Sequence, residues 1–434
     1  MQALFRPDRR SHSPDSAAST PDRRGRLEMR AVSPYPCPDV MTAGDTDQMQ
    51  PFTFNTTKSL VFRPGAAAEM AEVAGATLGP RILFVTDPGL TKLGLYDAAL
   101  ASLRGAGTTV TVFDTVEADP SRKTLEAAVA AGRAAEVTGI VGFGGGSSMD
   151  VAKVAALLLG SGEDLDDAWG VGQAKGPRLP LVLVPTTAGT GSEVTPVSIL
   201  TVGEEEKRGV SSPVILPDIA ILDANLTLGL PGPITAATGV DAMVHAIEAY
   251  ASANANNNPL SRMLAREALR LLGANIRTVV TTPGDVEARG AMLLGSMLAG
   301  QAFANSPVAA VHALAYPIGG TFHIPHGLSN ALVLPHVLRF NAPDAHTLYA
   351  EIAADAFPEL ASVEGDQARC AAFIEALEGL AVELGMPTRL RDVDIPETAL
   401  EKMASDAMLQ TRLLVNNPRP VEERDALAIY RAAW

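Results

Sequence analysis

The stretch GIVGFGGGSSMDVAKVAALLL, residues 139–159, decides the fold of this chain. It opens with a short apolar run, passes through three successive glycines and ends in a segment with the apolar density of a buried helix. This order predicts a strand, a glycine turn and a helix. The N–H groups and dipole at the start of such a helix attract phosphate, which can approach a glycine backbone closely. The alternative is an ordinary structural turn, because the motif matches neither the GxGxxG fingerprint nor a P-loop.

Strands and helices alternate on both sides of this stretch. RILFVTDPGL (81–90) and TVTVFDTV (109–116) predict strands, and TLEAAVAAGRAAEV (124–137) predicts a helix. LPLVLVPTTAGTGSEVT (179–195) predicts a buried strand followed by a second turn, rich in glycine and hydroxyl residues. Such alternation implies right-handed βαβ units and a parallel sheet, which binds ligands beyond the carboxyl ends of its strands. Both turns are expected at that edge, where the hydroxyls would suit cofactor phosphate, ribose and amide groups.

After Pro231 the pattern becomes helical and strand signals nearly vanish. The first 50 residues differ again, since they are rich in Arg, Ser, Pro and Asp, have no apolar period, and resemble neither a signal peptide nor a transit peptide. We therefore expect a disordered N-terminal extension over residues 1–50, an α/β domain over 51–232 and an all-helical domain over 233–434.

Composition limits the classes of function. A chain of 434 residues, 47% of them hydrophobic, can bury two cores, and its net charge of −15 argues against nucleic acid and anionic membranes as binding targets. Two cysteines, Cys37 and Cys370, can build neither a disulfide framework nor a cysteine-rich zinc site, which favours the cytoplasm. No apolar run approaches the roughly 18 residues of a membrane-spanning helix.

The histidines predict a metal site. Asp241 and His245 in GVDAMVHAIEAY are four residues apart, so on a helix they share one face and can hold one ion. Imidazole and carboxylate suit a borderline divalent metal such as iron, zinc or manganese. The alternative is a hydrogen bond within the helix. Five of the seven histidines fall in one later stretch and can supply further ligands: His312, His323, His326, His336 and His346.

Asp87 ends the predicted strand in LFVTDPGL. A carboxylate at this place can accept hydrogen bonds from both hydroxyls of an adenosine ribose, and it would repel a 2′-phosphate. The alternative is a turn or helix-capping aspartate, the commoner role before Pro-Gly.

Four motifs in one chain, in this order, point to a family: GGGSSMDVAK, PTTAGTGSEVTP, GVDAMVHAIEAY and VHALAYPIGGTFHIPHGLSNALVLPH. Together they resemble the iron-containing (group III) alcohol dehydrogenases over roughly residues 55–434. The resemblance implies an α/β dinucleotide-binding domain followed by an all-α metal-binding domain, the dehydroquinate synthase-like fold, with the active site between them.

The resemblance also implies site residues. Its metal ligands fall on Asp241, His245, His312 and His326, and Tyr316 stands where many members carry a second histidine near the nicotinamide. That tyrosine resembles the branch acting on 4-hydroxy acids, so a 4-hydroxy acid dehydrogenase or transhydrogenase of the same fold is an alternative function. Asp119 stands where many members have asparagine. The implied cofactor-binding positions are Asp87, Asp119, Gly145, Gly146, Ser147, Asp150, Thr186, Thr187, Thr190, Thr195, Lys207 and Leu226.

The resulting hypothesis is metal-dependent hydride transfer between NAD and a small primary alcohol, diol or hydroxy acid, or the reverse reduction of the aldehyde. The metal is expected to be Fe²⁺, with Zn²⁺ or Mn²⁺ as alternatives, and the chain is expected to form a homodimer or larger homo-oligomer. Phe303, Ala304 and Phe322 are candidate pocket walls, whereas His336 is interpreted as structural.

Three other functions stay open at this point. A metal-independent enzyme similar to maleylacetate reductase should lack part of the ligand set. A lyase or polyol-phosphate dehydrogenase of the related fold should carry extra Lys or Arg, and residues 301–336 contain neither. A non-catalytic metal- or nucleotide-binding protein is the third.

Overall fold

The structure is a computed structural model that describes residues 50–203 and 206–434. Gln50–Trp434 form one compact unit. The expected N-terminal extension, except for Gln50, lies outside the described residues.

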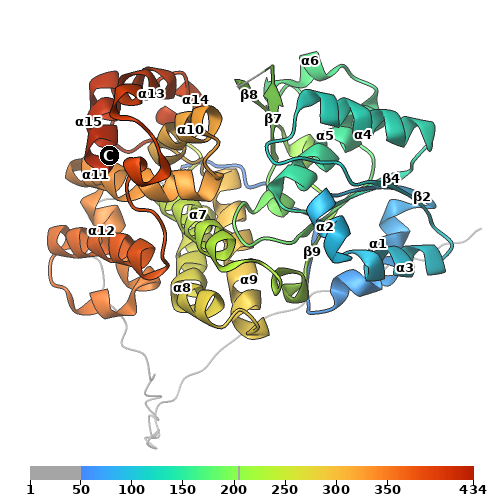
Figure 1. The fold of residues 1–434 in the computed structure, drawn as a ribbon, viewed down its shortest axis with the longest axis horizontal. Coiled ribbons are helices and arrows are strands. Elements are labelled where there is room, and N and C mark those ends of the chain that lie inside the picture. Colours follow the sequence, from blue (N-terminus) through green and yellow to red (C-terminus); the bar gives the residue numbers. More distant parts are fainter. Residues whose placement is uncertain (1–49, 204–205) are drawn as a thin grey trace, which may run out of the picture. The chain divides into compact units, whose positions relative to one another are not determined.

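A six-stranded sheet forms the first half of this unit, and every strand pairs in parallel with its neighbours (Figure 1). The central strands β4 and β6 are buried at every residue, whereas the edge strands are partly exposed. Buried parallel strands need apolar side chains on both faces, which explains why these segments do not alternate in polarity. Across the sheet the strands are β1 (Ser59–Phe62), β9 (Ile219–Leu222), β6 (Leu181–Pro185), β4 (Gly139–Gly144), β2 (Arg81–Val85) and β3 (Thr109–Phe113).

Helices cover both faces of the sheet (Figure 1). Leu83 and Ile140 pack on one face against α4 (Arg122–Ala134) and α5 (Gly146–Ser161). The adjacent residues Ile82, Phe84 and Val141 point to the opposite face, where they pack against three other helices. These are η1 (Ala66–Glu69), α1 (Met70–Leu78) and α3 (Asp97–Gly105).

The strand order places a topological switch point between β2 and β4. Without β1, the order across the sheet is β3-β2-β4-β6-β9. Numbered by their order in the chain, these five strands read 2-1-3-4-5, an arrangement found in doubly wound sheets. Such sheets bind ligands at the switch point, beyond the carboxyl ends of the strands. Asp87 lies just beyond β2, and the three glycines 144–146 run from the last residue of β4 to the first residue of α5. The sheet therefore brings these two sequence motifs to one edge.

Smaller elements complete this half. β7 and β8 form an antiparallel hairpin, and the short β5 pairs with β8 in a second sheet. The remaining elements are α2 (Pro88–Leu93), α6 (Leu165–Ala168), β5 (Gly170–Val171), η2 (Ser192–Val194), β7 (Val197–Val202), β8 (Glu206–Ser211), η3 (Pro213–Ile215) and η4 (Ala224–Thr227).

The second half is helical. Its central helix α7 packs against α8, α9 and α11 around the largest hydrophobic core of the described residues. The helices are α7 (Gly232–Ala251), α8 (Pro259–Thr281), α9 (Val286–Asn305), α10 (Ala310–Phe322), α11 (His326–Ala356), η5 (Pro358–Ser362), α12 (Asp366–Glu383), η6 (Leu390–Val393), η7 (Glu397–Ala399), α13 (Leu400–Ala407), α14 (Thr411–Leu414) and α15 (Glu423–Ala433).

The change from strands to helices falls between the end of β9 at Leu222 and the start of α7 at Gly232. The predicted fold class, a parallel α/β half followed by a helical half, is confirmed. The exact division into domains at residue 232 stays a prediction, because Gln50–Trp434 pack as one unit. Within the described part of the chain, no helix combines the length and apolarity needed to cross a bilayer.

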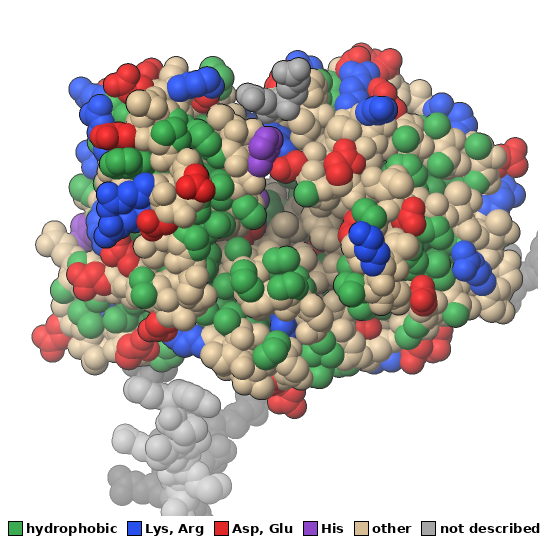
Figure 2. Space-filling model, viewed as in Figure 1, with side chains coloured by type: hydrophobic (Ala, Val, Ile, Leu, Met, Phe, Trp, Pro, Cys, Tyr) green, Lys and Arg blue, Asp and Glu red, His purple; other side chains and the backbone are tan. Residues whose placement is uncertain are grey.

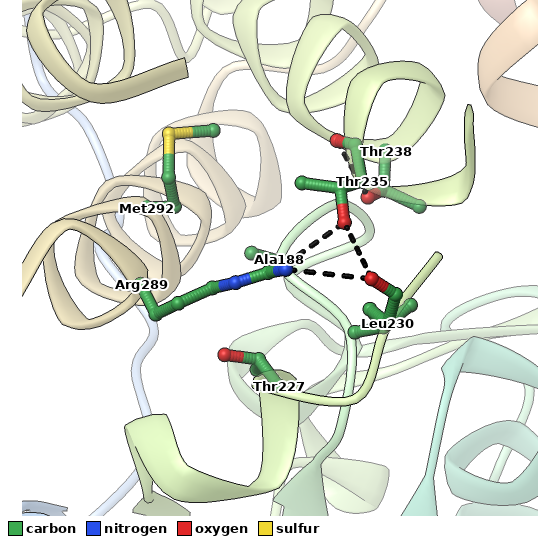
Figure 3. Close-up of a pocket in the computed structure, with 7 residues that line it drawn as sticks. All are labelled: Ala188, Thr227, Leu230, Thr235, Thr238, Arg289 and Met292. Carbon is green, nitrogen blue, oxygen red and sulfur yellow. Dashed lines mark hydrogen bonds between the residues drawn. The ribbon is translucent and has the colours of Figure 1, made fainter. Parts of the chain in front are cut away.

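A buried arginine fixes the start of α7. Arg289 on α9 is 3% exposed, and its guanidinium donates to the Thr235 hydroxyl at 2.9 Å and to the Leu230 carbonyl (Figure 3). It also donates to the backbone carbonyl of Pro283 at 3.0 Å. Burial lowers the pKa of Arg289 below its ordinary value. The cavity beside it measures about 10 Å³, room for one water, so it is not a substrate pocket.

Candidate active site

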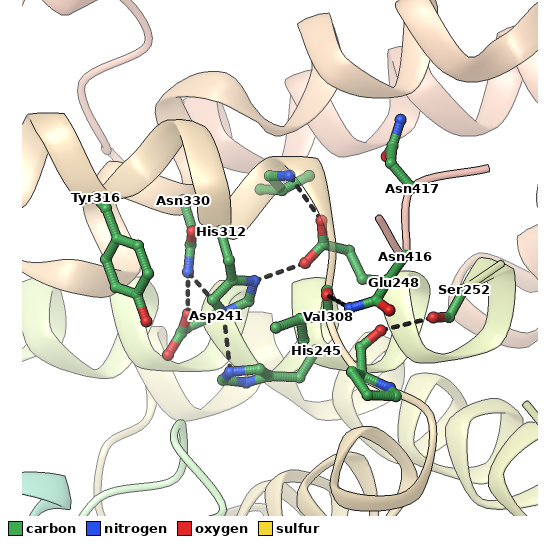
Figure 4. Close-up of polar contacts among 12 residues, drawn as sticks. Asp241, His245, Glu248, Ser252, Val308, His312, Tyr316, Asn330, Asn416 and Asn417 are labelled. Carbon is green, nitrogen blue, oxygen red and sulfur yellow. Dashed lines mark hydrogen bonds and ion pairs between the residues drawn. The ribbon is translucent and has the colours of Figure 1, made fainter. Parts of the chain in front are cut away.

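Four side chains from three helices converge on one point. Figure 4 shows three of them, Asp241, His245 and His312. Asp241 and His245 lie one turn apart on α7, His312 lies on α10, and His326 is the first residue of α11. One ligand atom from each residue can be chosen such that all four lie within 4.8 Å of one another. The structure therefore brings together all four residues expected to bind the metal.

A glycine allows α11 to reach α7. A Cβ on Gly327 would collide with the backbone carbonyl of Ala237 and would press on the Asp241 side chain at 3.2 Å. Without that side chain the first turn of α11 lies directly against α7, which places His326 Nε2 3.8 Å from Asp241 Oδ1. Sequence alone indicated the shared face of Asp241 and His245, whereas this contact depends on tertiary packing.

The cluster is buried on three sides. Asp241, His245 and His312 are at most 4% exposed, whereas the His326 side chain is 42% exposed, so access is from the His326 side. Burial lowers the pKa of His245 to about 3, so this imidazole is neutral and keeps a lone pair for a ligand. Burial also opposes the ionised form of Asp241, but the three histidines and the Asn330 amide hold its pKa below the ordinary value.

Glu248 is a functional residue that sequence reasoning missed. Its Oε2 lies 2.6 Å from Nδ1 of His312, and its Oε1 accepts a hydrogen bond from the Val311 N–H at 2.7 Å. A carboxylate on Nδ1 fixes the imidazole orientation and leaves Nε2 free to bind an ion. The signal was present, because Glu248 follows Asp241 by seven residues and lies on the same face of α7.

Asn330 is a second missed residue. It is fully buried one turn into α11, and its Nδ2 donates to Asp241 Oδ1 at 2.6 Å. The same nitrogen lies 3.3 Å from Nε2 of His312 and 3.3 Å from Nε2 of His326. Among the described residues Asn330 Oδ1 and His245 Nδ1 are buried without a hydrogen-bond donor or acceptor. Three imidazoles and a carboxylate around one point fit a borderline divalent metal.

The glycine turn lies at the carboxyl end of β4, beside Asp87. Gly144 has φ 151°, a conformation that favours glycine, and a Cβ there would meet the Ser148 side chain and lie 3.4 Å from Asp87 Oδ2. Helix α5 begins at Gly146 without a side-chain cap, so its first N–H groups are available to an anion. Asp87 Oδ1 caps α2 by accepting from Gly89 N and Leu90 N, so the capping interpretation is correct and the carboxylate also borders the turn.

The second loop lies against this turn. A Cβ on Gly145 would be 3.7 Å from the Thr187 hydroxyl, and one on Gly146 would be 3.1 Å from the Thr190 methyl group. The Thr186 N–H donates to the Gly144 carbonyl at 3.0 Å, and Ser147 is partly exposed on the first turn of α5. These expected cofactor positions are close together.

Asp150 and Thr195 belong to a buried polar network. Asp150 accepts from the Ser192 hydroxyl at 2.7 Å, and the fully buried Lys153 Nζ donates to Ser192 Oγ at 2.7 Å and Thr195 Oγ1 at 3.1 Å. Burial lowers the pKa of Lys153 to about 8. Both expected cofactor residues therefore connect α5 to the second loop, and Lys153, which sequence reasoning did not single out, holds them together.

Three expected cofactor positions remain, and two of them form a pair beside the metal cluster. Asp119 and Lys207 form an ion pair at 2.8 Å, and both charges influence the pKa of His326, which burial lowers overall. Leu226, only 8% exposed, packs in the core against the α1 and α3 face of the sheet.

The second loop also touches the metal cluster. A Cβ on Gly189 would meet the Thr238 side chain at 2.7 Å, so glycine here lets the loop approach α7 one turn before Asp241. The Gly189 backbone also influences the pKa of His245. In the view of Figure 2 the surface is hollowed at its middle, with a histidine at the rim.

Aromatic side chains flank the cluster. Phe303 stacks on His245 with ring centres 4.4 Å apart, as expected for a wall of the site. The Tyr316 ring lies 6.4 Å from the His326 ring and beside the Asp241–Asn330 pair in Figure 4. Ala304 and Phe322 are partly buried, His323 is exposed at the end of α10, and His336 is partly buried within α11.

Comparison with known proteins identifies the family. Residues 57–224 match the family described as iron-containing alcohol dehydrogenase, and residues 235–434 match the C-terminal part of the Fe-containing alcohol dehydrogenase family. Long-chain-alcohol dehydrogenase 1 of Geobacillus thermodenitrificans is 44% identical over 361 residues, which cover 81% of this chain and 89% of that protein.

Solved structures agree. A crystal structure of 1,3-propanediol oxidoreductase has a TM-score of 0.85 and 36% identity, covering 89% of this chain and 100% of that one. Sulfoacetaldehyde reductase of Bifidobacterium kashiwanohense, solved in complex with NAD⁺, has a TM-score of 0.78 and 29% identity, covering 88% of this chain and 98% of that one. The chain is an oxidoreductase that belongs to the iron-containing alcohol dehydrogenase family.

Proposed function

We propose that this protein transfers hydride between an alcohol and NAD with the help of one divalent metal held by Asp241, His245, His312 and His326. The observation that carries the proposal is the convergence of these four ligand atoms within 4.8 Å. The Glu248 carboxylate on His312 supports it, because such a carboxylate is typical of metal-bound histidines.

The chain's own residues prepare the site for this reaction. A bound Fe²⁺, or alternatively Zn²⁺ or Mn²⁺, supplies Lewis acidity toward the substrate oxygen, and NAD supplies the hydride acceptor. The Glu248 carboxylate lies 2.6 Å from His312 Nδ1, which turns Nε2 of that ring toward the cluster. Phe303 excludes water from the His245 side, and exposure of the His326 side leaves one direction open for substrate.

NAD binding is proposed at the switch point of the sheet. The start of α5 would hold the pyrophosphate, and the Asp87 carboxylate beside Gly144 would face the adenosine ribose. The NAD⁺ in the sulfoacetaldehyde reductase structure supports this choice of cofactor.

The proposed substrates are a small primary alcohol, diol or hydroxy acid and the matching aldehyde. Related proteins are described as acting on long-chain alcohols, 1,3-propanediol and sulfoacetaldehyde, which supports the class and does not select a member. A cytoplasmic location and a homodimer or larger homo-oligomer complete the proposal.

Metal analysis with paired histidine variants tests it. The unaltered protein, purified with added Fe²⁺, should hold about one metal per chain and form NADH with short alcohols or diols. His312→Ala should lose the metal and at least about a hundredfold in turnover, because a coordinating side chain contributes more than the 10–100-fold typical of an outer-shell group. His336→Ala, outside the cluster on α11, should keep both. Full metal and full turnover in His312→Ala would make the assignment wrong.

A further inference from the structure

A guanidinium group from a distant part of the chain lies at the rim of the candidate site. Arg412 on α14 donates from Nη2 to the Tyr316 hydroxyl at 3.0 Å, and its guanidinium carbon lies 5.9 Å from the centre of the Tyr316 ring. Tyr316 is in turn the aromatic neighbour of His326, the exposed member of the metal cluster. The arginine is thus separated from the open side of the cluster by one side chain.

The charge of Arg412 is not neutralised within the described residues. Several other arginines of the helical half pair with carboxylates, as Arg266 does with Asp355 and Arg277 with Glu383. Arg412 is exposed, and its side chain donates a hydrogen bond to the Tyr316 hydroxyl. Among the described residues no carboxylate lies within ion-pair distance of its guanidinium. Its remaining N–H donors form the planar fork that matches a carboxylate or sulfonate.

We propose that Arg412 binds the anionic end of the substrate while the substrate's alcohol or aldehyde end lies at the metal cluster. The substrate class is then a short chain with a hydroxyl or aldehyde at one end and a carboxylate or sulfonate at the other. This inference rests on the proposed function for the oxygen end and adds a specificity-determining residue for the opposite end. Tyr316 positions the guanidinium by accepting its hydrogen bond.

The cation beside Tyr316 comes from a distant part of the sequence. Residues 301–336 carry no Lys or Arg, yet the structure places Arg412 against Tyr316 from outside that window. Lys207, another cation near His326, already forms an ion pair with Asp119. Arg412 is therefore the group best placed to bind an anion beside Tyr316.

A matched pair of substrates isolates this contact. 4-Hydroxybutyrate and 1,4-butanediol have the same chain length and differ in the terminal carboxylate. The ratio of their kcat/KM values, acid over diol, should fall about tenfold in Arg412→Gln, the size expected for a partly solvated charge-assisted hydrogen bond. Arg412→Lys should keep part of the ratio because it keeps the charge.

The control is Arg391→Gln. Arg391 is also exposed and also lies over an aromatic ring, with its guanidinium carbon 5.4 Å from the centre of the Trp434 ring. It is not in contact with Tyr316 or the metal cluster in the described structure, so its variant should leave the substrate ratio unchanged. A fall in the ratio of equal size in both variants would overturn the role of Arg412.

Butyrate binding gives a second readout that needs no turnover. Calorimetric titration of the metal- and NAD-loaded protein with butyrate should show binding that weakens as salt rises and is lost in Arg412→Gln. Titration with 1-butanesulfonate distinguishes the two anions, and the tighter one names the preferred end group. If the unaltered protein binds neither, the inference is wrong, even if it oxidises butanediol. If it oxidises no alcohol but binds butyrate through Arg412, the proposed function fails and the anion site stands.

Discussion

Glu248 contacts His312, one of the four proposed metal ligands, without being a proposed ligand itself. Both carboxylate oxygens are used, one by the His312 imidazole at 2.6 Å and one by the Val311 N–H at 2.7 Å. The residue therefore holds the imidazole and the backbone at the start of α10 in one arrangement. Because Glu248 lies on the same helix as Asp241 and His245, α7 positions three of the four ligands directly or through one hydrogen bond.

Glu248→Gln tests this arrangement at the residue scale. Glutamine has one acceptor oxygen, so either the imidazole or the backbone N–H loses its acceptor. Metal affinity, measured by competition with a chromogenic chelator, should fall about 10–100-fold while the fold is kept. Glu351→Gln, at a glutamate that accepts from the Tyr250 hydroxyl, is the control and should bind metal normally. Equal affinities in the two variants would show that Glu248 does not support the site.

Asp87 has two tasks that one substitution can separate. Its Oδ1 caps α2 and its Oδ2 borders the glycine turn. Asp87→Asn keeps a capping side chain but removes the negative charge, so thermal stability should stay near that of the unaltered protein. The preference for NAD over NADP, measured as the ratio of kcat/KM values, should narrow by about tenfold or more because repulsion of the 2′-phosphate is lost. An unaltered enzyme that prefers NADP would contradict the proposed role.

At the scale of elements, local patterns predicted most of the fold. The strands β2, β3, β4 and β6 and the helices α4, α5 and α7 were predicted from apolar runs, periodicity and glycine turns, because those signals are contained within each segment. The shared face of Asp241 and His245 followed from helical spacing in the same way. The convergence of His312 and His326 on that face depends on how α10 and α11 pack, and only the family resemblance indicated it.

Glu248, Lys153 and Arg412 were not predicted from the sequence, and the physical reason differs for each. Glu248 follows the periodicity of α7 and could have been found. Lys153 reads as an ordinary helix residue, since nothing local shows that loop 192–197 closes over its amine. Arg412 is far along the chain from Tyr316, and no local pattern indicates that α14 lies beside α10.

The short helix η2 buries a carboxyl group, which makes stability depend on pH. Glu193 is 1% exposed, its Oε1 has no hydrogen-bond donor among the described residues, and burial raises its pKa to about 7. The ordinary value is 4.5, so the folded protein binds the proton more tightly than the unfolded chain. The contribution of the Glu193 carboxyl to the free energy of unfolding is therefore fully present below pH 4.5 and is lost as pH rises through 7.

Glu193→Gln should remove that dependence. Between pH 5 and 7.5 the free energy of unfolding of the metal- and cofactor-free protein should fall relative to the variant, by up to about 3 kcal/mol. Urea unfolding at a series of pH values measures the difference. Glu206→Gln, at an exposed position on β8, should follow the unaltered protein. Parallel curves for the unaltered protein and Glu193→Gln would show that this carboxyl is not the source.

For the whole molecule, the described unit begins before its first strand. The Thr53 N–H donates to the Asn256 side chain at 2.9 Å, and the Asn55 N–H donates to the Asn305 side chain at 2.6 Å. This extended segment therefore connects the N-terminal side of the sheet to the helical half. All the candidate site residues lie within residues 50–434.

Two truncations separate these regions. A chain that starts at Gln50 should keep the melting temperature and turnover of the full chain, because it keeps every contact of the site. A chain that starts at Lys58 loses the hydrogen bonds to Asn256 and Asn305 and should melt a few degrees lower, since each bond contributes about 1 kcal/mol. Differential scanning calorimetry compares them. A large loss in the Gln50 chain would show that residues 1–49 contribute to stability or activity.

The spread of the four proposed metal ligands over α7, α10 and α11 has a consequence for the protein's lifetime. An unfolded chain cannot offer the complete set, so metal binding adds to the stability of the folded state by mass action, by roughly 2.7 kcal/mol at a free metal concentration a hundred times Kd. A cell short of that metal would lose this margin, and the apo protein would open to proteases more often. Metal supply would then set how many copies of the enzyme persist, in addition to how many are active.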